Sequence, residues 1–284
     1  MAVKKGFKLT SGDVEILTCV YQCRLVRIDH LEKLTGRSTR PLNTRLMKLT
    51  ENGYLYRRKG ELHEKYVYTL NRKAVPILSE SGVAPAESID LHVRRLRDLK
   101  ELFLRHALML TDIHIALILA SRESSIQLVD WREGKELYDS ITILEDGERK
   151  KLPVRPDSIF VLEDTRRPAG KNQLCFFLEA DRSTTTNKRF QRKIKGYRAY
   201  FEQGVHTKKY GITAARVLTV TLTEARAFNL CKTSGDVLLA NISKFYYFGV
   251  VSSITPECIF DAILITPHDF KKGKRYSLIP PLAK

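Results

Sequence analysis

Residues 27–55, RIDHLEKLTGRSTRPLNTRLMKLTENGYL, hold two apolar patterns of helical spacing with a short break between them. The first predicts a helix over residues 27–34, with one face formed by Ile28, Leu31 and Leu34. The second predicts a helix over residues 39–51, with one face formed by Leu42, Leu46 and Leu49. Gly36 breaks the first helix, and Ser38 can cap the second. Two helices joined by a tight turn that contains glycine are typical of a helix-turn-helix.

The sequence on either side extends this motif. A preceding helix is predicted from Val14 to Tyr21, where apolar residues recur at helical spacing. After the motif, two β-prone triplets, residues 54–56 and 66–68, flank the basic segment 57–61, RRKGE. A supporting helix and a basic hairpin turn the motif into a winged helix-turn-helix, which we assign to residues 1–82.

The second helix of the motif and the hairpin carry side chains suited to DNA. The candidates on the helix and the turn before it are Arg37, Ser38, Thr39, Arg40, Asn43, Thr44, Arg45 and Lys48. The candidates on the hairpin are Arg57, Arg58 and Lys59. Arg and Asn can make paired hydrogen bonds to guanine and adenine in the major groove, whereas Thr and Lys suit phosphates. An ordinary solvated helix face, or a winged helix that docks on a protein, would show the same pattern.

The overall charge favours a polyanionic partner. The chain of 284 residues carries 49 Lys and Arg against 32 Asp and Glu, which gives a formal net charge of +17 and a pI near 9.7. Each phosphate that a basic protein neutralises releases condensed counterions, and this release favours binding. We therefore expect double-stranded DNA as the partner. The alternative is a basic protein whose charge serves only solubility.

The sequence predicts a cytoplasmic protein that does not bind a membrane. The first residues, MAVKKG, have no apolar run after their charges, so we expect no signal peptide. The apolar stretch 108–120 is interrupted by Asp112 and His114, so we expect no membrane span. The 5 cysteines are odd in number and mostly far apart, which argues against a disulfide framework or a zinc site.

A second domain is predicted over residues 90–284, after a linker at residues 83–89. Residues 91–122 form a long helical stretch whose first half is basic. β-prone and helical segments then alternate, which is typical of an α/β domain around a mixed sheet. The predicted strands are residues 126–131, 141–144, 158–162, 173–179, 217–221 and 262–266. The predicted helices are residues 186–203 and 223–232.

Two short segments of this domain place acidic side chains beside predicted strands. Asp157 follows Arg155-Pro156 at the start of one strand. Residues 174–182, LCFFLEADR, predict a strand buried on both faces. Glu179 and Asp181 point to the same side of it, because strand side chains alternate. Such a pair is costly to bury unless a metal ion or basic groups neutralise it.

The order of these acids resembles the PD-(D/E)XK nuclease fold, which is the restriction-endonuclease-like fold. The resemblance implies that Asp157, Glu179 and the backbone carbonyl of Ala180 hold Mg²⁺. Asp181 stands where that fold has a lysine, and the lysine can then come from the next helix, where Lys193 is best placed. The catalytic candidates are Asp157, Glu179, Asp181 and Lys193. Alternatively, Pro156-Asp157 is a simple turn, and the later acids pair with Arg182, Arg189 or Lys193.

From about Thr10 to Thr266, the chain resembles the replication-relaxation family of plasmids and integrative elements. The segments that carry the resemblance are the winged helix, residues 106–122, Trp131, residues 155–157, residues 177–182 and residues 216–218. The resemblance implies a role in plasmid replication, or in relaxing DNA at a transfer origin with a relaxase or another mobile-element protein.

We therefore predict an α+β protein with an N-terminal winged helix-turn-helix and a restriction-endonuclease-like domain. The predicted function is that of a double-stranded DNA-binding accessory protein of a mobile element. Two alternatives remain. One is a Mg²⁺-dependent endonuclease, in which the acids and the helix lysine form the active site. The other is a winged-helix transcriptional regulator whose second domain binds a partner or a ligand.

Overall fold

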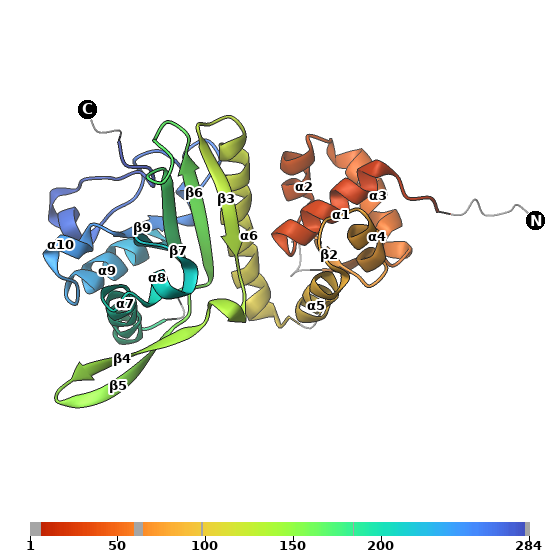
Figure 1. The fold of residues 1–284 in the computed structure, drawn as a ribbon. Coiled ribbons are helices and arrows are strands. Elements are labelled where there is room, and N and C mark those ends of the chain that lie inside the picture. The colour runs from red at the N-terminus through yellow and green to blue at the C-terminus, as the bar shows by residue number, and fades with distance from the viewer. Residues whose placement is uncertain (1–6, 60–64, 98, 184, 282–284) are drawn as a thin grey trace, which may run out of the picture. The chain divides into compact units, whose positions relative to one another are not determined.

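The computed structural model describes residues 7–59, 65–97, 99–183 and 185–281 (Figure 1). The chain divides into two compact units, Met1–Ile115 and Ala116–Lys284. The first unit consists of helices and a small hairpin, and the second holds a five-stranded mixed sheet packed with helices. The division falls within helix α6 (Glu101–Arg122), and the linker predicted at residues 83–89 includes the start of α5 (Ala86–Arg97).

The first unit begins with the helices α1 (Ser11–Cys23), α2 (Ile28–Thr35) and α3 (Thr39–Glu51). Local hydrogen bonding fixes the start of α1, because the backbone N–H of Thr10 donates to Asp13 Oδ2 over 2.8 Å. Gly36 ends α2 in the left-handed region at φ 69°, a conformation that glycine adopts without steric cost. Ser38 is the residue before the first turn of α3. The turn between α2 and α3 is therefore short and well defined.

A hairpin and short helices complete the first unit. Strands β1 (Leu55–Arg58) and β2 (Val67–Leu70) pair antiparallel, and they are followed by α4 (Ala74–Glu80). The predicted hairpin tip included Gly60 and Glu61, which lie outside the described residues. The core of the unit is made of fully buried aliphatic side chains from the helices, among them Leu17, Leu31, Leu42, Leu46 and Leu49.

The second unit is organised around strand β7 (Gln173–Asp181) at the centre of the five-stranded sheet. The strand order is β3 (Ile126–Arg132), β6 (Ser158–Asp164), β7, β8 (Ala215–Thr221) and β9 (Tyr246–Val250). β7 pairs antiparallel with β6 and parallel with β8, so the sheet is mixed as predicted. Strands β4 (Asp139–Glu145) and β5 (Glu148–Val154) form a separate antiparallel hairpin.

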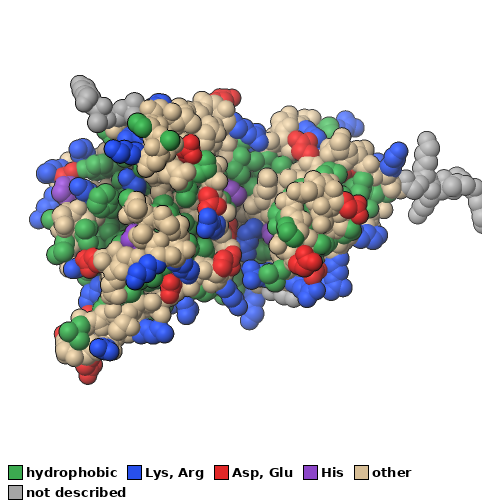
Figure 2. All heavy atoms as spheres, viewed as in Figure 1, with side chains coloured by type: hydrophobic (Ala, Val, Ile, Leu, Met, Phe, Trp, Pro, Cys, Tyr) green, Lys and Arg blue, Asp and Glu red, His purple; other side chains and the backbone are tan. Residues whose placement is uncertain are grey.

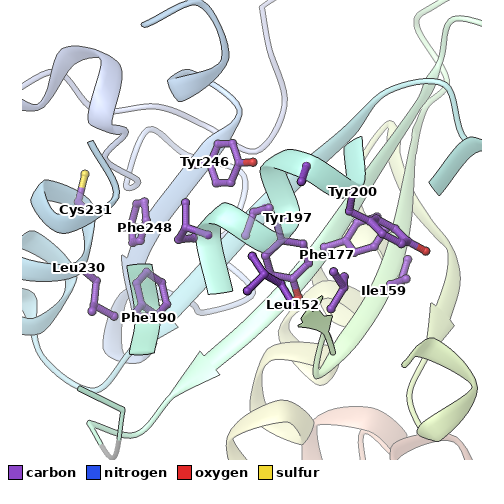
Figure 3. Close-up of a cluster of buried hydrophobic side chains, with 14 of the residues drawn as sticks. Leu152, Ile159, Phe177, Phe190, Tyr197, Tyr200, Leu230, Cys231, Tyr246 and Phe248 are labelled. Atoms are coloured by element: carbon purple, nitrogen blue, oxygen red, sulfur yellow. The ribbon is translucent and has the colours of Figure 1, made fainter. Parts of the chain in front are cut away.

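Helices α7 (Asn187–Glu202) and α9 (Glu224–Gly235) cover one face of the sheet. Between helices and strands lies an apolar and aromatic cluster that includes Phe177, Phe190, Tyr197, Leu230 and Phe248 (Figure 3). Helix α7 also packs on the β4–β5 hairpin. Gly196 permits this close approach, because a Cβ there would lie 3.3 Å from the carbonyl oxygen of Pro153. Trp131 on β3 stacks on Phe160 of β6 with ring centroids 5.8 Å apart.

The sequence-based prediction of the second unit misses several elements. Residues 262–266 are not a strand, because only Leu264 and Ile265 form isolated bridges, to Tyr276 and Phe248 respectively. Strands β5 and β9 were not predicted. The remaining unpredicted helices are α8 (Val205–Tyr210), α10 (Ala240–Ser243) and the 3₁₀ turns η1 (Lys135–Leu137), η2 (Val251–Ser253) and η3 (Pro267–Lys272).

One helix in the described part of the chain is long and apolar enough to cross a membrane. It is the stretch Phe103–Arg122 of α6, and half of that stretch is buried. By length and composition this helix therefore meets the criterion that residues 108–120, interrupted by Asp112 and His114, were expected to fail. The core helix of a soluble protein meets the same criterion. Asp112 within it accepts a hydrogen bond from Arg27 over 2.7 Å.

Candidate functional site

Helix α3 separates its side chains into a buried apolar face and an exposed polar one. Its three leucines are fully buried against the rest of the first unit. The exposed predicted DNA contacts are Ser38, Thr39, Arg40, Asn43, Thr44 and Lys48. Two of them have partners within the unit, since Thr39 donates to Glu32, and Thr44 donates to the carbonyl of Arg40 over 3.1 Å. Exposed polar side chains therefore lie along α3, with the exposed Met47 among them.

Arg45 and Arg37 bind within the first unit. Arg45 Nε donates to Asp13 Oδ1 over 2.7 Å, and a second guanidinium nitrogen binds the other oxygen of the same carboxylate. Asp13 is completely buried. Burial raises the pKa of Asp13, but hydrogen bonds from Arg45 and Thr10 outweigh this effect and hold it below its usual 3.8. Arg37 binds Glu15 and the carbonyl of Gly12.

The three predicted hairpin contacts also differ in their surroundings. Arg57 is exposed, and its guanidinium lies 4.4 Å from the ring centroid of Tyr66. Arg58 is half-buried and donates to the carbonyl of Leu99. Lys59 is exposed. Arg57 of β1 and Lys59, directly after the strand, are therefore accessible to solvent, whereas Arg58 binds the segment after α5.

We expect Arg45→Met to destabilise the protein by about 2–3 kcal/mol near neutral pH, because it leaves the buried Asp13 carboxylate without its cation. Arg40→Met, at an exposed position of the same helix, should change the stability by less than about 0.5 kcal/mol. The Arg45 deficit should shrink at acid pH, where Asp13 is protonated in the folded and unfolded states alike. Urea unfolding followed by circular dichroism checks this, and equal effects of the two variants would contradict it.

In the second unit, the structure brings Asp157 next to the acidic end of β7. The backbone N–H of Asp157 donates to the carbonyl of Leu178 over 3.0 Å. Its Oδ2 accepts from the backbone N–H of Ala180 over 2.8 Å. These two contacts place Asp157 beside Glu179, as the order of the segments predicted.

Glu179 is the centre of a buried polar cluster. Only 2% of it is exposed, and its two carboxylate oxygens accept from Lys193 Nζ and Tyr197 Oη. Both donors come from α7 and are one helical turn apart. Burial raises the pKa of Glu179 to about 7, against the pull of Lys193 and with a further contribution from the charge of Asp157. Burial lowers the pKa of Lys193, but Glu179 and Asp157 outweigh it and raise that pKa.

Asp181 has a different partner, which was not predicted from the sequence. Arg226, in the first turn of α9, donates through Nε to Asp181 Oδ2 over 2.6 Å. The same guanidinium binds Asn187 Oδ1 over 3.1 Å and the carbonyl of Thr185. Arg226 thus joins the end of β7, the start of α7 and α9. The sequence places Arg226 three residues after the helix-capping Thr223, but it does not show which acid the arginine meets.

These residues do not fit the Mg²⁺ site that the nuclease resemblance implies. Lys193 and Tyr197 already occupy both oxygens of Glu179. Asp181 is paired with the guanidinium of Arg226. Across the described residues, no group of three or more His, Cys, Asp or Glu side chains could hold a metal ion. The cation next to Glu179 in this arrangement is the ammonium group of Lys193.

We expect Lys193→Met to lower the free energy of unfolding by about 3 kcal/mol at about pH 8.5, because Glu179 loses its buried cation. The pKa of Glu179 rises from 4.5 to about 7 on folding, so its ionisation already costs stability as the pH increases between these values. Without Lys193, Glu179 should ionise only at a higher pH, so its ionisation costs stability over a wider pH range. The loss of unfolding free energy caused by Lys193→Met should therefore be smaller at about pH 5.5 than at about pH 8.5.

Lys195→Met is the matched control on the same helix. Lys195 pairs with the partly exposed Glu145, so the control should lose less stability, and its loss should not depend on the ionisation of Glu179. Urea unfolding at the two pH values measures both variants. A Lys193 deficit that stayed constant with pH would contradict the buried pair.

The fold and the site together define a mixed α+β protein with a helical N-terminal unit and a carboxylate cluster at the centre of a sheet. The chain belongs to the replication-relaxation family, whose profile matches residues 17–215. This match includes α3, both acidic segments and Lys193, and it ends at the first residue of β8. Neither a curated protein nor a solved structure matches the chain.

Proposed function

We propose that this protein is a double-stranded DNA-binding accessory protein of a mobile element. In this proposal the first unit is a winged helix-turn-helix, α3 enters the major groove, and the β1–β2 hairpin contacts the phosphate backbone. The observation that carries the proposal is the division of α3, whose leucines are buried while Arg40, Asn43 and Lys48 share a solvent-exposed face. Membership of the replication-relaxation family supports the mobile-element context.

The charge of the first unit supports the same proposal. Residues 1–115 contain 21 Lys and Arg against 13 Asp and Glu. Figure 2 shows Lys and Arg side chains spread over both units in this view, with acidic side chains scattered among them. A surface of this kind attracts a polyanion over the distance of a Debye length, before any specific contact forms. We place the protein in the cytoplasm, where a relaxase or another mobile-element protein would be its partner.

For the second unit we propose a nuclease-like fold that does not hydrolyse DNA. Asp157, Glu179 and Lys193 meet as the PD-(D/E)XK resemblance requires, which supports the fold. The engagement of both Glu179 oxygens by α7 argues for a structural role of the cluster. Its ion pairs would then hold the sheet and α7 together, and would not act on a phosphodiester.

Replacing Arg40 or Asn43 by Ala should weaken the preference for one or two base pairs by about 1–3 kcal/mol each, because each removes hydrogen bonds to a base edge. Lys33→Ala, which removes an exposed cation from α2, is the control and should leave the preference intact. Sites selected from a randomised duplex pool measure the effect. Unchanged selected sites for both α3 variants would exclude α3 as the reading helix.

The hairpin should act through phosphates and not through bases. Changing Arg57, Arg58 and Lys59 together to Ala should weaken binding to all duplexes alike, and should reduce the slope of log affinity against log salt by up to about 2, because Arg58 is engaged with the carbonyl of Leu99. The control is the triple change of Lys271, Lys272 and Lys274 to Ala, which removes the same charge from the second unit. An equal reduction in the control would mean that only net charge matters.

The purified protein should not cleave supercoiled plasmid with Mg²⁺ or Mn²⁺, because Glu179 is engaged by Lys193 and Tyr197. The measurement is the conversion of supercoiled into nicked or linear plasmid, seen on an agarose gel. The control is Glu179→Gln. Cleavage by the wild type that this variant abolished would establish the endonuclease alternative and overturn the proposed structural role.

A further inference from the structure

The exposed face of α3 contains one large hydrophobic side chain, Met47, which is 49% exposed. By helical spacing it lies one turn beyond Asn43 and Thr44 and next to Lys48. The exposed Glu51 lies one turn further on, so the neighbours of Met47 on this face are polar or charged. The apolar core of the unit does not use it, because the leucines of α3 fill that role. A flexible apolar side chain in the middle of a polar reading face requires its own explanation.

We propose that Met47 recognises the 5-methyl group of a thymine in the major groove. This inference rests on the proposed function of α3 as the reading helix. The thymine methyl is the apolar group that base pairs present on the major-groove edge, and side chains contact it by apolar packing. The unbranched thioether of methionine can adapt its shape to such a group.

The surroundings of Met47 favour DNA over a protein partner. Arg40 and Lys48 flank it on the exposed face of the helix, which suits the phosphates on both sides of the groove and opposes docking of an apolar or basic protein surface. The ion pair between Arg45 and Asp13 fixes α3 against α1, so the direction of the Met47 side chain is set by the fold.

The spacing predicts where the thymine lies. Met47 is four residues beyond Asn43, a distance of about 6 Å along the helix axis. Adjacent base pairs are about 3.4 Å apart, so the thymine should lie one or two base pairs from the position that Asn43 reads. The contribution of one methyl contact should be about fourfold in affinity, the worth of one buried methyl group.

The test combines a change in the protein with a change in the DNA. Wild type, Met47→Ala and Met47→Leu are each used to select sites from a randomised duplex pool. Binding is then measured on the site selected by the wild type and on the same site with deoxyuridine in place of single thymines, which removes only the methyl group. Met47→Leu is the matched control, because it keeps an apolar side chain of similar size at an exposed position.

We expect one thymine at which deoxyuridine weakens wild-type binding about fourfold. The same exchange should also weaken Met47→Leu but leave Met47→Ala unaffected. Deoxyuridine without effect on the wild type, or an equal effect on wild type and Met47→Ala, would overturn the proposal. The proposed function fails in a different way, since then no variant selects a site at all. Selection of an Asn43-dependent site at which deoxyuridine has no effect would support the proposed function and would exclude Met47 as the residue that recognises a thymine methyl group.

Discussion

Strand β7 carries two carboxylates into the interior of the second unit, and each needs a cation there because an unpaired buried charge costs several kcal/mol. Two helices supply them: Lys193 of α7 binds Glu179, and Arg226 of α9 binds Asp181. Since both helices also pack on the same face of the sheet, the ion pairs fix their register along β7. A shift of α7 by one turn would move Lys193 away from Glu179. The two ion pairs thus fasten α7 and α9 to the central strand.

The first unit follows the same principle on a smaller scale. Asp13 at the start of α1 is buried, and Arg45 of α3 neutralises it. This contact sets the rotation of α3 about its own axis, and with it the set of side chains that face solvent. Its consequence is that Arg45, although predicted as a DNA contact, is engaged within the unit and holds α1 and α3 together. The exposed polar side chains of α3 are the ones that remain available to a partner.

The sequence predicted those features that depend on neighbouring residues. Helix α3 has the predicted bounds because its leucine spacing acts locally, although the side chain of Ser38 makes no capping hydrogen bond. Glu179 meets Asp157 and Lys193 because strand alternation and a helical stripe determine their directions. Features that depend on strand order were missed. Arg226 reaches Asp181 only because β8 lies beside β7. Strand β5, ERKKLPV, is too charged to be recognised, and its apolar side chains are buried only by the packing of α7.

Trp131 is the single tryptophan of the chain, and it belongs to the second unit. Its ring stacks on Phe160, and its Nε1 donates to Glu133 over 2.8 Å. Its intrinsic fluorescence therefore reports on the pairing of β3 with β6. The helices of the first unit contribute to the far-ultraviolet ellipticity but not to this emission. Wherever the two optical signals change at different denaturant concentrations, their separation measures how independently the two halves of the chain unfold.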